Sequence, residues 1–318
     1  MTLDSWLLGY PTQFRSALRG CATGELVPAI ALLNLAMIAE SPAEMQKLVS
    51  DLQEPAIADA FAVSRLEQLR ALACRHIDAP ETIAAVLSAM GCDWQTAPDP
   101  RARLAELAAG FDRCAAVSPE ASVALYSFGA AEQLAAVTQE LVAQLLRWGV
   151  VKAPDSCLDI GCGIGRLEEA LAPLVRHIVG IDISPVMIET AQRRCGHLAN
   201  ASFRRVHGAG LAEFRRAAFD RVFAIDCFPY LVDCGADVVA THFQDAARIL
   251  KPAGHFVIVN FSYRGDLAAD RRDVARLASQ AGLHVERSGE RSLANWDGTA
   301  FCLVKPCSSG LGSGHAPP

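Results

Sequence analysis

The spacing of apolar side chains changes character near residue 150. Before that point they recur at helical intervals, and no segment alternates as a strand would. Helices are predicted over residues 29–39, 42–52, 55–77, 81–90, 101–116, 119–129 and 131–148. The last of them has an apolar stripe made of Leu134, Val137, Leu141, Leu145 and Trp148. The first part of the chain is therefore expected to be all-helical.

Serine–proline pairs mark where two of these helices begin. Ser41 precedes Pro42 and is followed by Glu44, which is the pattern of a capping box with proline at the first helical position. Ser118 and Pro119 repeat the serine–proline arrangement ahead of residues 119–129. Local chemistry therefore predicts two helix starts independently of the apolar spacing.

Beyond residue 150, short β-rich runs alternate with helices. Strands are predicted over 156–160, 177–182, 201–207, 221–226, 255–261, 284–288 and 299–304, and helices over 185–195 and 243–250. This alternation is typical of an α/β fold with a mostly parallel, doubly wound sheet. Only the turn-rich segment 289–298 separates the last two strands, which should therefore pair antiparallel. The expected fold is a seven-stranded sheet with an antiparallel last strand, preceded by an all-α region.

Composition narrows the range of functions. The 318 residues are 52% hydrophobic, with a formal net charge of -6 and a pI near 5.8. Nucleic acid is not an expected partner, because binding it normally needs a concentrated Lys/Arg face and the arginine pairs here are scattered. The longest apolar stretch, 27–39, is too short to span a bilayer, and no secretory signal pattern opens the chain. Eleven cysteines without a CxxC pair favour reduced thiols and a cytoplasmic location.

Three glycines at alternate positions follow the first predicted strand. Gly161, Gly163 and Gly165 lead into a helix predicted over 167–174. A ligand approaches the backbone closely only where no Cβ intervenes, and a tight turn favours the backbone angles that glycine adopts at low cost. Open α/β sheets bind their ligands at the carboxyl ends of the strands. This turn is therefore the first candidate for a binding site.

The next predicted strand ends in an acidic residue, Asp182, nineteen residues beyond Gly163. A carboxylate in that place can accept hydrogen bonds from ribose hydroxyls. Dinucleotide sites and S-adenosylmethionine (SAM) sites both use glycines after the first strand and an acid after the second. The alternative interpretation is that the glycines form an ordinary tight turn and that Asp182 is an unrelated surface aspartate. These two features predict a nucleoside-containing ligand without deciding which one.

Four segments resemble, in the expected order, the motifs of the class I SAM-dependent methyltransferases. The first two motifs are matched by LDIGCGIGRLEEAL and VGIDISPVMIETAQRR, the fourth-strand motif by FDRVFAIDCFPYL, and the segment through the fifth strand by AARILKPAGHFVIVNF. With the closing hairpin, the resemblance covers about residues 145–306. Asp159 also favours this family, since dinucleotide sites usually carry an apolar residue there. The resemblance implies a Rossmann-like methyltransferase domain with SAM as its cofactor.

The resemblance implies roles for the glycine turn. Gly161, Cys162 and Gly163 would present backbone to the methionine moiety of SAM. Gly165 would let the following helix pack closely, and Asp159 would support the loop and the bound amino-acid end.

The resemblance also implies how the nucleoside is held. Asp182 would hold the ribose hydroxyls, and Ile183 would lie against the adenine. Family members often place an Asp or Asn after the third strand to meet the adenine amino group. Gly210 and Leu211 stand in that region here, so backbone groups are expected to read the adenine instead.

Methyl transfer from a sulfonium is an in-line displacement, so the enzyme mainly holds the reacting atoms in line in a dry site. Asp226, which ends the fourth strand, should lie near the methionine end and the acceptor. Either Asp226 or Tyr230 is expected to orient or deprotonate the acceptor. Further candidates at the end of the fifth strand are Asn260, Ser262 and Tyr263.

Histidines are not expected to take part. No metal is expected, because the eight histidines do not pair at ligand spacing with one another or with carboxylates. His242, on a predicted helix, is expected at the surface.

Tyr126 and Phe128 lie just ahead of the helix that enters the α/β region. Their rings offer aromatic faces to a sulfonium, a cation–π contact of about 1–2 kcal/mol when desolvated. The equally weighted alternative is that both rings only fasten the helical region to the sheet. Tyr126 is therefore a candidate catalytic residue, and Phe128 is a candidate cofactor-binding residue.

The chain is expected to comprise a helical cap or dimerisation region (1–130), a SAM-binding domain (131–306) and a flexible tail (307–318). The expected function is methylation of a small molecule of secondary metabolism. The N-terminal helices are expected to mediate a homodimer. Three alternatives stay open: an enzyme that cyclises or cleaves SAM, an NAD-dependent oxidoreductase, and a non-catalytic SAM-binding protein.

Overall fold

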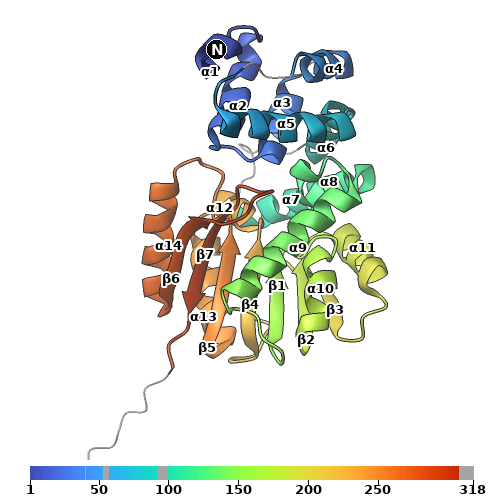
Figure 1. Ribbon diagram of the computed structural model, residues 1–318. Helices are drawn as coiled ribbons and strands as arrows, with labels where there is room; N and C mark the ends of the chain where they lie inside the picture. Colours follow the sequence, from blue (N-terminus) through green and yellow to red (C-terminus); the bar gives the residue numbers. More distant parts are fainter. Residues whose placement is uncertain (40, 53–56, 92–98, 308–318) are drawn as a thin grey trace, which may run out of the picture.

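The computed structural model describes residues 1–39, 41–52, 57–91 and 99–307. In Figure 1, helices α1 to α6 gather beyond one end of a large sheet, α7 and α8 lie between that cluster and the strands, and α9 runs across one face of the sheet. Apart from Cys307, the predicted tail lies outside the described residues, as do the first two residues of the helix predicted over 55–77.

The region ahead of the sheet is all-helical, as expected. Its helices are α1 (Leu3–Leu7), α2 (Thr12–Thr23), α3 (Pro28–Ile38), α4 (Pro42–Asp51), α5 (Ala60–Arg75), α6 (Ala79–Met90), α7 (Pro100–Val117), α8 (Pro119–Val123), the 3₁₀ turn η1 (Leu125–Ser127) and α9 (Ala131–Arg147). Helices α1 and α2 occupy residues for which the apolar spacing had given no element. None of the described helices is both long and apolar enough to cross a bilayer.

The serine caps lie where the sequence placed them. The Ser41 hydroxyl accepts the Glu44 amide at 3.2 Å, and the Ser118 hydroxyl accepts the Ala121 amide at 3.2 Å. Each serine thereby satisfies one of the free amide groups of a helix start. The Glu44 carboxylate accepts a hydrogen bond from Gln13 on α2, so it also joins two helices.

Seven strands form one sheet in the order β3-β2-β1-β4-β5-β7-β6. They are β1 (Ser156–Ile160), β2 (His177–Asp182), β3 (Ala201–Arg205), β4 (Phe219–Ile225), β5 (Leu250–Val259), β6 (His284–Arg291) and β7 (Thr299–Val304). The strands from β1 to β5 pair in parallel, and β7 runs antiparallel to both of its neighbours, β5 and β6. The predicted fold class and the antiparallel closing hairpin are both confirmed.

Two strands end earlier than predicted because their backbone turns left-handed. Strand β4 stops at Ile225 and β5 at Val259, and the next residues, Asp226 and Asn260, have φ of 61° and 60°. Non-glycine residues rarely adopt such angles, which break the hydrogen-bond ladder. Both side chains are thereby turned out of the strands at the carboxyl edge of the sheet.

Helices cover both faces of the sheet (Figure 1). The connections contain α10 (Arg166–Leu171), the 3₁₀ turn η2 (Ala172–Leu174), α11 (Pro185–Cys195), α12 (Phe228–Cys234), α13 (Ala236–Ile249) and α14 (Leu267–Ala281). One core joins the N-terminal helices to α9, α10 and one face of the sheet. The other packs α12, α13 and α14 against the opposite face.

The expectation of a surface position for His242 is wrong. Helix α13 begins at Ala236, well before the predicted start at residue 243, and its side chains at Val238, Val239 and Phe243 are buried. Because residues three and four apart share a helix face, His242 lies on that buried side with Val238. Only 1% of its surface is exposed.

Candidate active site

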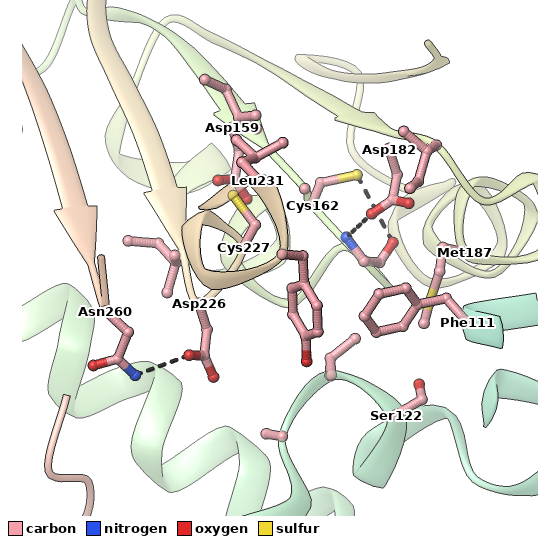
Figure 2. Close-up of a pocket in the computed structure, with 18 of the residues that line it drawn as sticks. Phe111, Ser122, Asp159, Cys162, Asp182, Met187, Asp226, Cys227, Leu231 and Asn260 are labelled. Atoms are coloured by element: carbon pink, nitrogen blue, oxygen red, sulfur yellow. Dashed lines mark hydrogen bonds between the residues drawn. The ribbon is translucent and has the colours of Figure 1, made fainter. Parts of the chain in front are cut away.

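A cavity of about 380 Å³ lies between the carboxyl ends of the strands and the N-terminal helices. This volume falls within the range of ordinary small-molecule sites. Figure 2 shows the strand-end side chains on one side and Phe111 of α7 and Ser122 of α8 on the other. The sequence-predicted residues that line it are Tyr126, Asp159, Gly161, Cys162, Gly163, Asp182, Ile183, Gly210, Leu211, Asp226, Tyr230, Asn260 and Tyr263.

The turn after β1 has little room for side chains at its glycines. A Cβ at Gly161 would lie 2.5 Å from the Cβ of Cys227, and one at Gly163 would lie 2.6 Å from Cγ1 of Val123. Gly165 is outside the cavity lining, and a Cβ there would lie 3.0 Å from the Cβ of Ala191 on α11. Close helix packing is the role the sequence resemblance implied for Gly165, whereas the first two glycines let the turn border the cavity.

Asp182 fastens the end of β2 to this turn. One carboxylate oxygen accepts the Gly163 amide at 3.0 Å and the other accepts the Ser184 amide at 2.9 Å (Figure 2 shows the first). Burial raises the pKa of Asp182, while these amides lower it by stabilising the charged form. Each oxygen retains a second lone pair, so the carboxylate can still accept hydroxyl donors from a ligand.

Asp159 and Glu168 form a buried acidic pair beneath the turn. Oδ1 of Asp159 and both carboxylate oxygens of Glu168 accept no hydrogen bond from a described donor. Burial raises the pKa of Asp159 to about 8, and the Arg166 guanidinium opposes that rise. Burial and the neighbouring Asp159 raise the pKa of Glu168 well above its usual range. No sequence pattern distinguished Glu168, whose carboxylate lies against Gly180 of β2.

A positive charge also faces the cavity next to the glycine turn. Arg166, the first residue of α10, is 8% exposed, and its Nη1 donates to the Thr138 hydroxyl of α9 at 3.2 Å. That bond joins the helix after the turn to the long helix ahead of the sheet. An anionic group of a ligand would find this guanidinium within the same cavity.

Asp226, Asn260 and Tyr263 form a hydrogen-bonded group, the Asp226 cluster. Oδ1 of Asp226 accepts Nδ2 of Asn260 at 2.8 Å (Figure 2) and the Tyr263 hydroxyl at 2.7 Å. Oδ1 of Asn260 accepts the Thr299 amide at 3.0 Å, which directs the amide nitrogen toward Asp226. Burial raises the pKa of Asp226, and its two donors oppose that rise. Oδ2 accepts from no described residue and is available to a ligand. Ser262 instead donates to Asp270, at 2.8 Å.

Tyr126 and Trp296 stack beside the Asp226 cluster, with ring centroids 5.3 Å apart. The Tyr126 hydroxyl is buried and meets no hydrogen-bond partner among the described residues, and burial raises its pKa. Trp296 was missed because it lies in the turn-rich segment between β6 and β7. The only sequence signal was a tryptophan in a short connecting turn. The Glu140 carboxylate of α9 accepts the Ala294 and Asn295 amides, which holds that segment against the N-terminal helices.

Two expected contacts with a cofactor lack geometric support. Phe128 does not line the cavity, and its ring packs against His76 with centroids 5.1 Å apart. The Leu211 amide, expected to help read an adenine, donates to Oδ2 of Asp245 at 2.7 Å. Phe128 thus contacts another residue of the helical region, and the Leu211 amide already donates to Asp245. The cofactor contacts expected of both residues stay predictions. Tyr230 lies on the cavity wall, edge-on to Phe111.

His255, Glu286 and Cys302 lie close enough together to suggest a metal site, outside the cavity. Nδ1 of His255 lies 3.0 Å from Nη1 of Arg221, which can only donate, so Nδ1 accepts this hydrogen bond and the neutral ring carries its hydrogen on Nε2. Nε2 lies 3.2 Å from Glu286, and burial raises the pKa of Cys302 to about 12. These hydrogen bonds occupy the ligand atoms. That the protein needs no metal stays a prediction.

The geometry agrees with a comparison to known families. A family model described as a methyltransferase domain matches residues 158–258, from β1 through β5. The chain contains a class I SAM-dependent methyltransferase domain, a family in which SAM is the methyl donor.

Curated relatives match about a third of the chain. A demethylmenaquinone methyltransferase of Tropheryma whipplei (strain Twist) is 32% identical over 113 residues, 36% of this chain and 44% of that protein. A ubiquinone biosynthesis O-methyltransferase of Methylococcus capsulatus is 32% identical over 115 residues, 35% of this chain and 46% of that protein. The chain thus spans less than half the length of these relatives.

A solved structure extends the likeness in fold. Phosphoethanolamine N-methyltransferase 1 of Haemonchus contortus, determined with phosphoethanolamine and S-adenosylhomocysteine, superposes with a TM-score of 0.52. It is 19% identical, and the superposition covers 68% of this chain and 51% of that one. At this identity the likeness concerns the fold alone.

Proposed function

We propose that this chain transfers the methyl group of SAM to a small molecule held in the cavity. The observation that carries the proposal is the position of the glycine turn. The turn borders a cavity that helices close from the other side, and its Gly163 amide donates a hydrogen bond to Asp182. The match to the methyltransferase domain family supports the choice of SAM over a dinucleotide.

The cofactor would lie across the ends of β1 and β2. Gly161 and Gly163 leave space for its methionine part, and the unpaired Oδ1 of Asp159 suits the ammonium group of that part. Arg166 faces the same cavity and suits the carboxylate. Asp182 retains lone pairs for the ribose hydroxyls. When bound, SAM supplies an electrophilic methyl group on a positively charged sulfur.

The acceptor would lie against the Asp226 cluster. Oδ2 of Asp226 can accept the O–H or N–H of an acceptor and so aim its lone pair at the methyl carbon. As the carbon–sulfur bond breaks and the new bond forms, the acceptor becomes more acidic, and Asp226 can take its proton. Tyr126 and Tyr230 border the same space, and their rings help exclude water.

Several features favour a small acceptor. The cavity is covered by apolar side chains of the N-terminal helices, namely Ile30, Leu33, Leu104, Leu107 and Phe111. The net charge of -6 disfavours a nucleic acid. The names of two distant relatives refer to quinone methylation, which is consistent with small acceptors.

The N-terminal region, residues 1–130, is proposed to act as a cap and to mediate a homodimer. Its contribution to the cavity wall supports the first role. Exposed apolar side chains on its helices, including Leu8, Met37 and Phe61, support the second. Light scattering of the purified protein would test the dimer, and a monomer at micromolar concentration would contradict it.

Titration calorimetry with SAM, S-adenosylhomocysteine and NAD would test the cofactor, with Asp182→Ala as the variant. The proposal predicts binding of the first two only, weakened at least tenfold by the substitution because the ribose contacts and the tie to the turn are lost. A product assay with candidate acceptors then separates the reactions. S-adenosylhomocysteine indicates methyl transfer, and methylthioadenosine indicates an enzyme that cleaves SAM. The proposal fails if the wild type binds neither sulfur compound.

A further inference from the structure

The cavity extends from the glycine turn to the loop between β3 and β4, where a nucleoside base would lie if Asp182 holds the ribose. This end is almost entirely apolar. Its walls come from Leu104, Ile183, Val206, Leu211 and Leu231, together with the backbone of Gly208 and Gly210. An adenine there would find surfaces to lie against but few groups to recognise its amino substituent.

One polar side chain interrupts these walls. His242 of α13 lines the cavity although it is 1% exposed. Its helix touches the loop directly, because a Cβ at Gly210 would lie 2.9 Å from both Thr241 Cγ2 and Asp245 Oδ2. His242 therefore belongs to the same wall as Gly210 and Leu211.

The hydrogen bonding of His242 fixes which ring nitrogen can accept. Nδ1 lies 2.8 Å from the carbonyl oxygen of Val238, one turn earlier in α13. A carbonyl only accepts, so Nδ1 carries the hydrogen. Burial lowers the pKa of His242 and keeps the ring neutral. Nε2 is left with a bare lone pair, and no described residue donates to it.

The groups beside His242 are otherwise engaged. Asp245 accepts the Leu211 amide with Oδ2 and the Arg248 guanidinium with Oδ1. The Thr241 hydroxyl donates to the Asp237 carbonyl at 2.8 Å. Thr241 and Asp245 also lie outside the cavity lining. Within the described residues, His242 is thus the polar side chain that offers an acceptor to this end of the cavity.

We propose that Nε2 of His242 accepts a hydrogen bond from the exocyclic amino group of the cofactor's adenine. The inference rests on the proposed function, because it needs SAM in the cavity. It assigns base recognition to a helix that follows β4, in a chain with no acidic or amide side chain at residues 208–211. The neutral ring supplies an acceptor without placing another negative charge beside the ribose-binding Asp182.

The test compares two ligands by titration calorimetry: S-adenosylhomocysteine and its analogue with hydrogen in place of the purine amino group. The wild type is expected to bind the analogue about three- to tenfold more weakly, the range of one neutral hydrogen bond. His242→Phe keeps a ring in the wall but removes the acceptor, so it should bind both ligands alike. Thr241→Ala, on the same helix and beside the same loop, should keep the wild-type preference.

The wild-type comparison stands even if His242→Phe folds poorly, which thermal melting would reveal. Equal binding of both ligands by the wild type would overturn the inference and leave the proposed function intact. A preference that persists in a folded His242→Phe would also overturn it, because a backbone carbonyl would then be the acceptor. Binding of neither ligand by the wild type would overturn the proposed function itself.

Discussion

The glycine-turn end of the cavity and the Asp226 end differ in how much of the chain is needed to build each. The first is made by one strand–turn–helix segment and the end of the adjacent strand, joined by the hydrogen bond from Gly163 to Asp182. The second brings together η1, the ends of β4 and β5, and the loop before β7. A local motif therefore defines the end proposed to hold the cofactor, whereas tertiary packing defines the end proposed to hold the acceptor.

The two ends also differ in how well they tolerate substitution. Changes in the turn alter a backbone that has no spare room, as the close neighbours of Gly161 and Gly163 show. Changes at the Asp226 end alter side chains and loops, which can be exchanged while the strands remain in place. Substitutions at the glycine-turn end should therefore alter cofactor binding, and substitutions at the Asp226 end should alter acceptor binding and turnover.

The largest effect is expected for Gly163→Ala. The new Cβ would lie 2.6 Å from Val123, and the residue has φ of 53°, so either the turn or α8 must move. Movement of the turn also breaks the bond to Asp182. Because a displacement of about 1 Å can cost 100-fold in rate, SAM affinity and turnover should both fall about 100-fold or more. Titration calorimetry measures the SAM affinity, and a product assay measures the turnover.

Gly149→Ala is the matched control for that substitution. Gly149 also has a left-handed backbone, with φ of 68°, but a Cβ there would meet nothing within 4 Å. The control incurs the backbone cost of about 1 kcal/mol in stability without a steric clash. Equal losses of SAM affinity in the two variants would mean that space at the turn does not matter.

Asp226→Asn should separate the two ends of the cavity. The amide retains the shape of the carboxylate but cannot take a proton, so turnover should fall about 100-fold while SAM affinity changes less than about threefold. Asp233→Asn, in the same helix–turn region but outside the cavity lining, should leave both quantities unchanged. A comparable loss of SAM affinity in Asp226→Asn would show that this carboxylate serves the cofactor instead.

The sequence predicted the positions of the seven strands because each is a β-rich run with a turn signal at its end. Buried apolar side chains mark β1, β4 and β7, whereas β3 and β6 are largely exposed. It did not reveal α2, whose pattern is interrupted by Gly20, a position where a Cβ would lie 2.8 Å from the side chain of Leu26. The glycine there makes room for the connection between α2 and α3, which folds back onto α2. The antiparallel β7 was predictable because the preceding segment was too short for a crossover.

The candidate site was predictable where its residues are neighbours in the sequence. Asp159, the glycines and Asp182 follow from one motif pair, whereas Trp296 and His242 reach the cavity from a turn and from a buried helix face. Glu168 was hidden in a helix that looked amphipathic and charged. No local pattern distinguishes such residues from ordinary core or surface positions.

A smaller effect is expected for Glu140→Ala, which loosens the Asp226 end without touching the cavity. The substitution removes the acceptor for the Ala294 and Asn295 amides and so frees the segment that carries Trp296. KM for the acceptor should rise about tenfold, with SAM affinity unchanged. The exposed neighbour Gln139, changed to alanine, is the control on the same helix. An unchanged KM in Glu140→Ala would place Trp296 outside acceptor binding.

The smallest effect concerns stability and pH at the glycine-turn end. The pKa of buried Asp159 is about 8, above its unfolded value, and that of Glu168 is also raised. The folded protein therefore binds more protons than the unfolded chain, and its stability should fall as pH rises from about 4 through about 8. Glu168→Gln removes one of the two carboxyl groups and should flatten that fall, stabilising the protein by about 1–3 kcal/mol at pH 8.

Denaturant unfolding of the ligand-free protein between pH 6 and 8 measures this slope, with Glu169→Gln as the control at a partly exposed neighbouring position. The control should keep the wild-type slope because Glu169 is paired with Arg194 near the surface. An unchanged slope in Glu168→Gln would mean that the acidic pair does not share protons in the pH range tested. A flattened slope would indicate that a carboxyl group beneath the glycine turn is protonated in the ligand-free protein. That group could ionise when the ammonium group of a cofactor approaches Asp159.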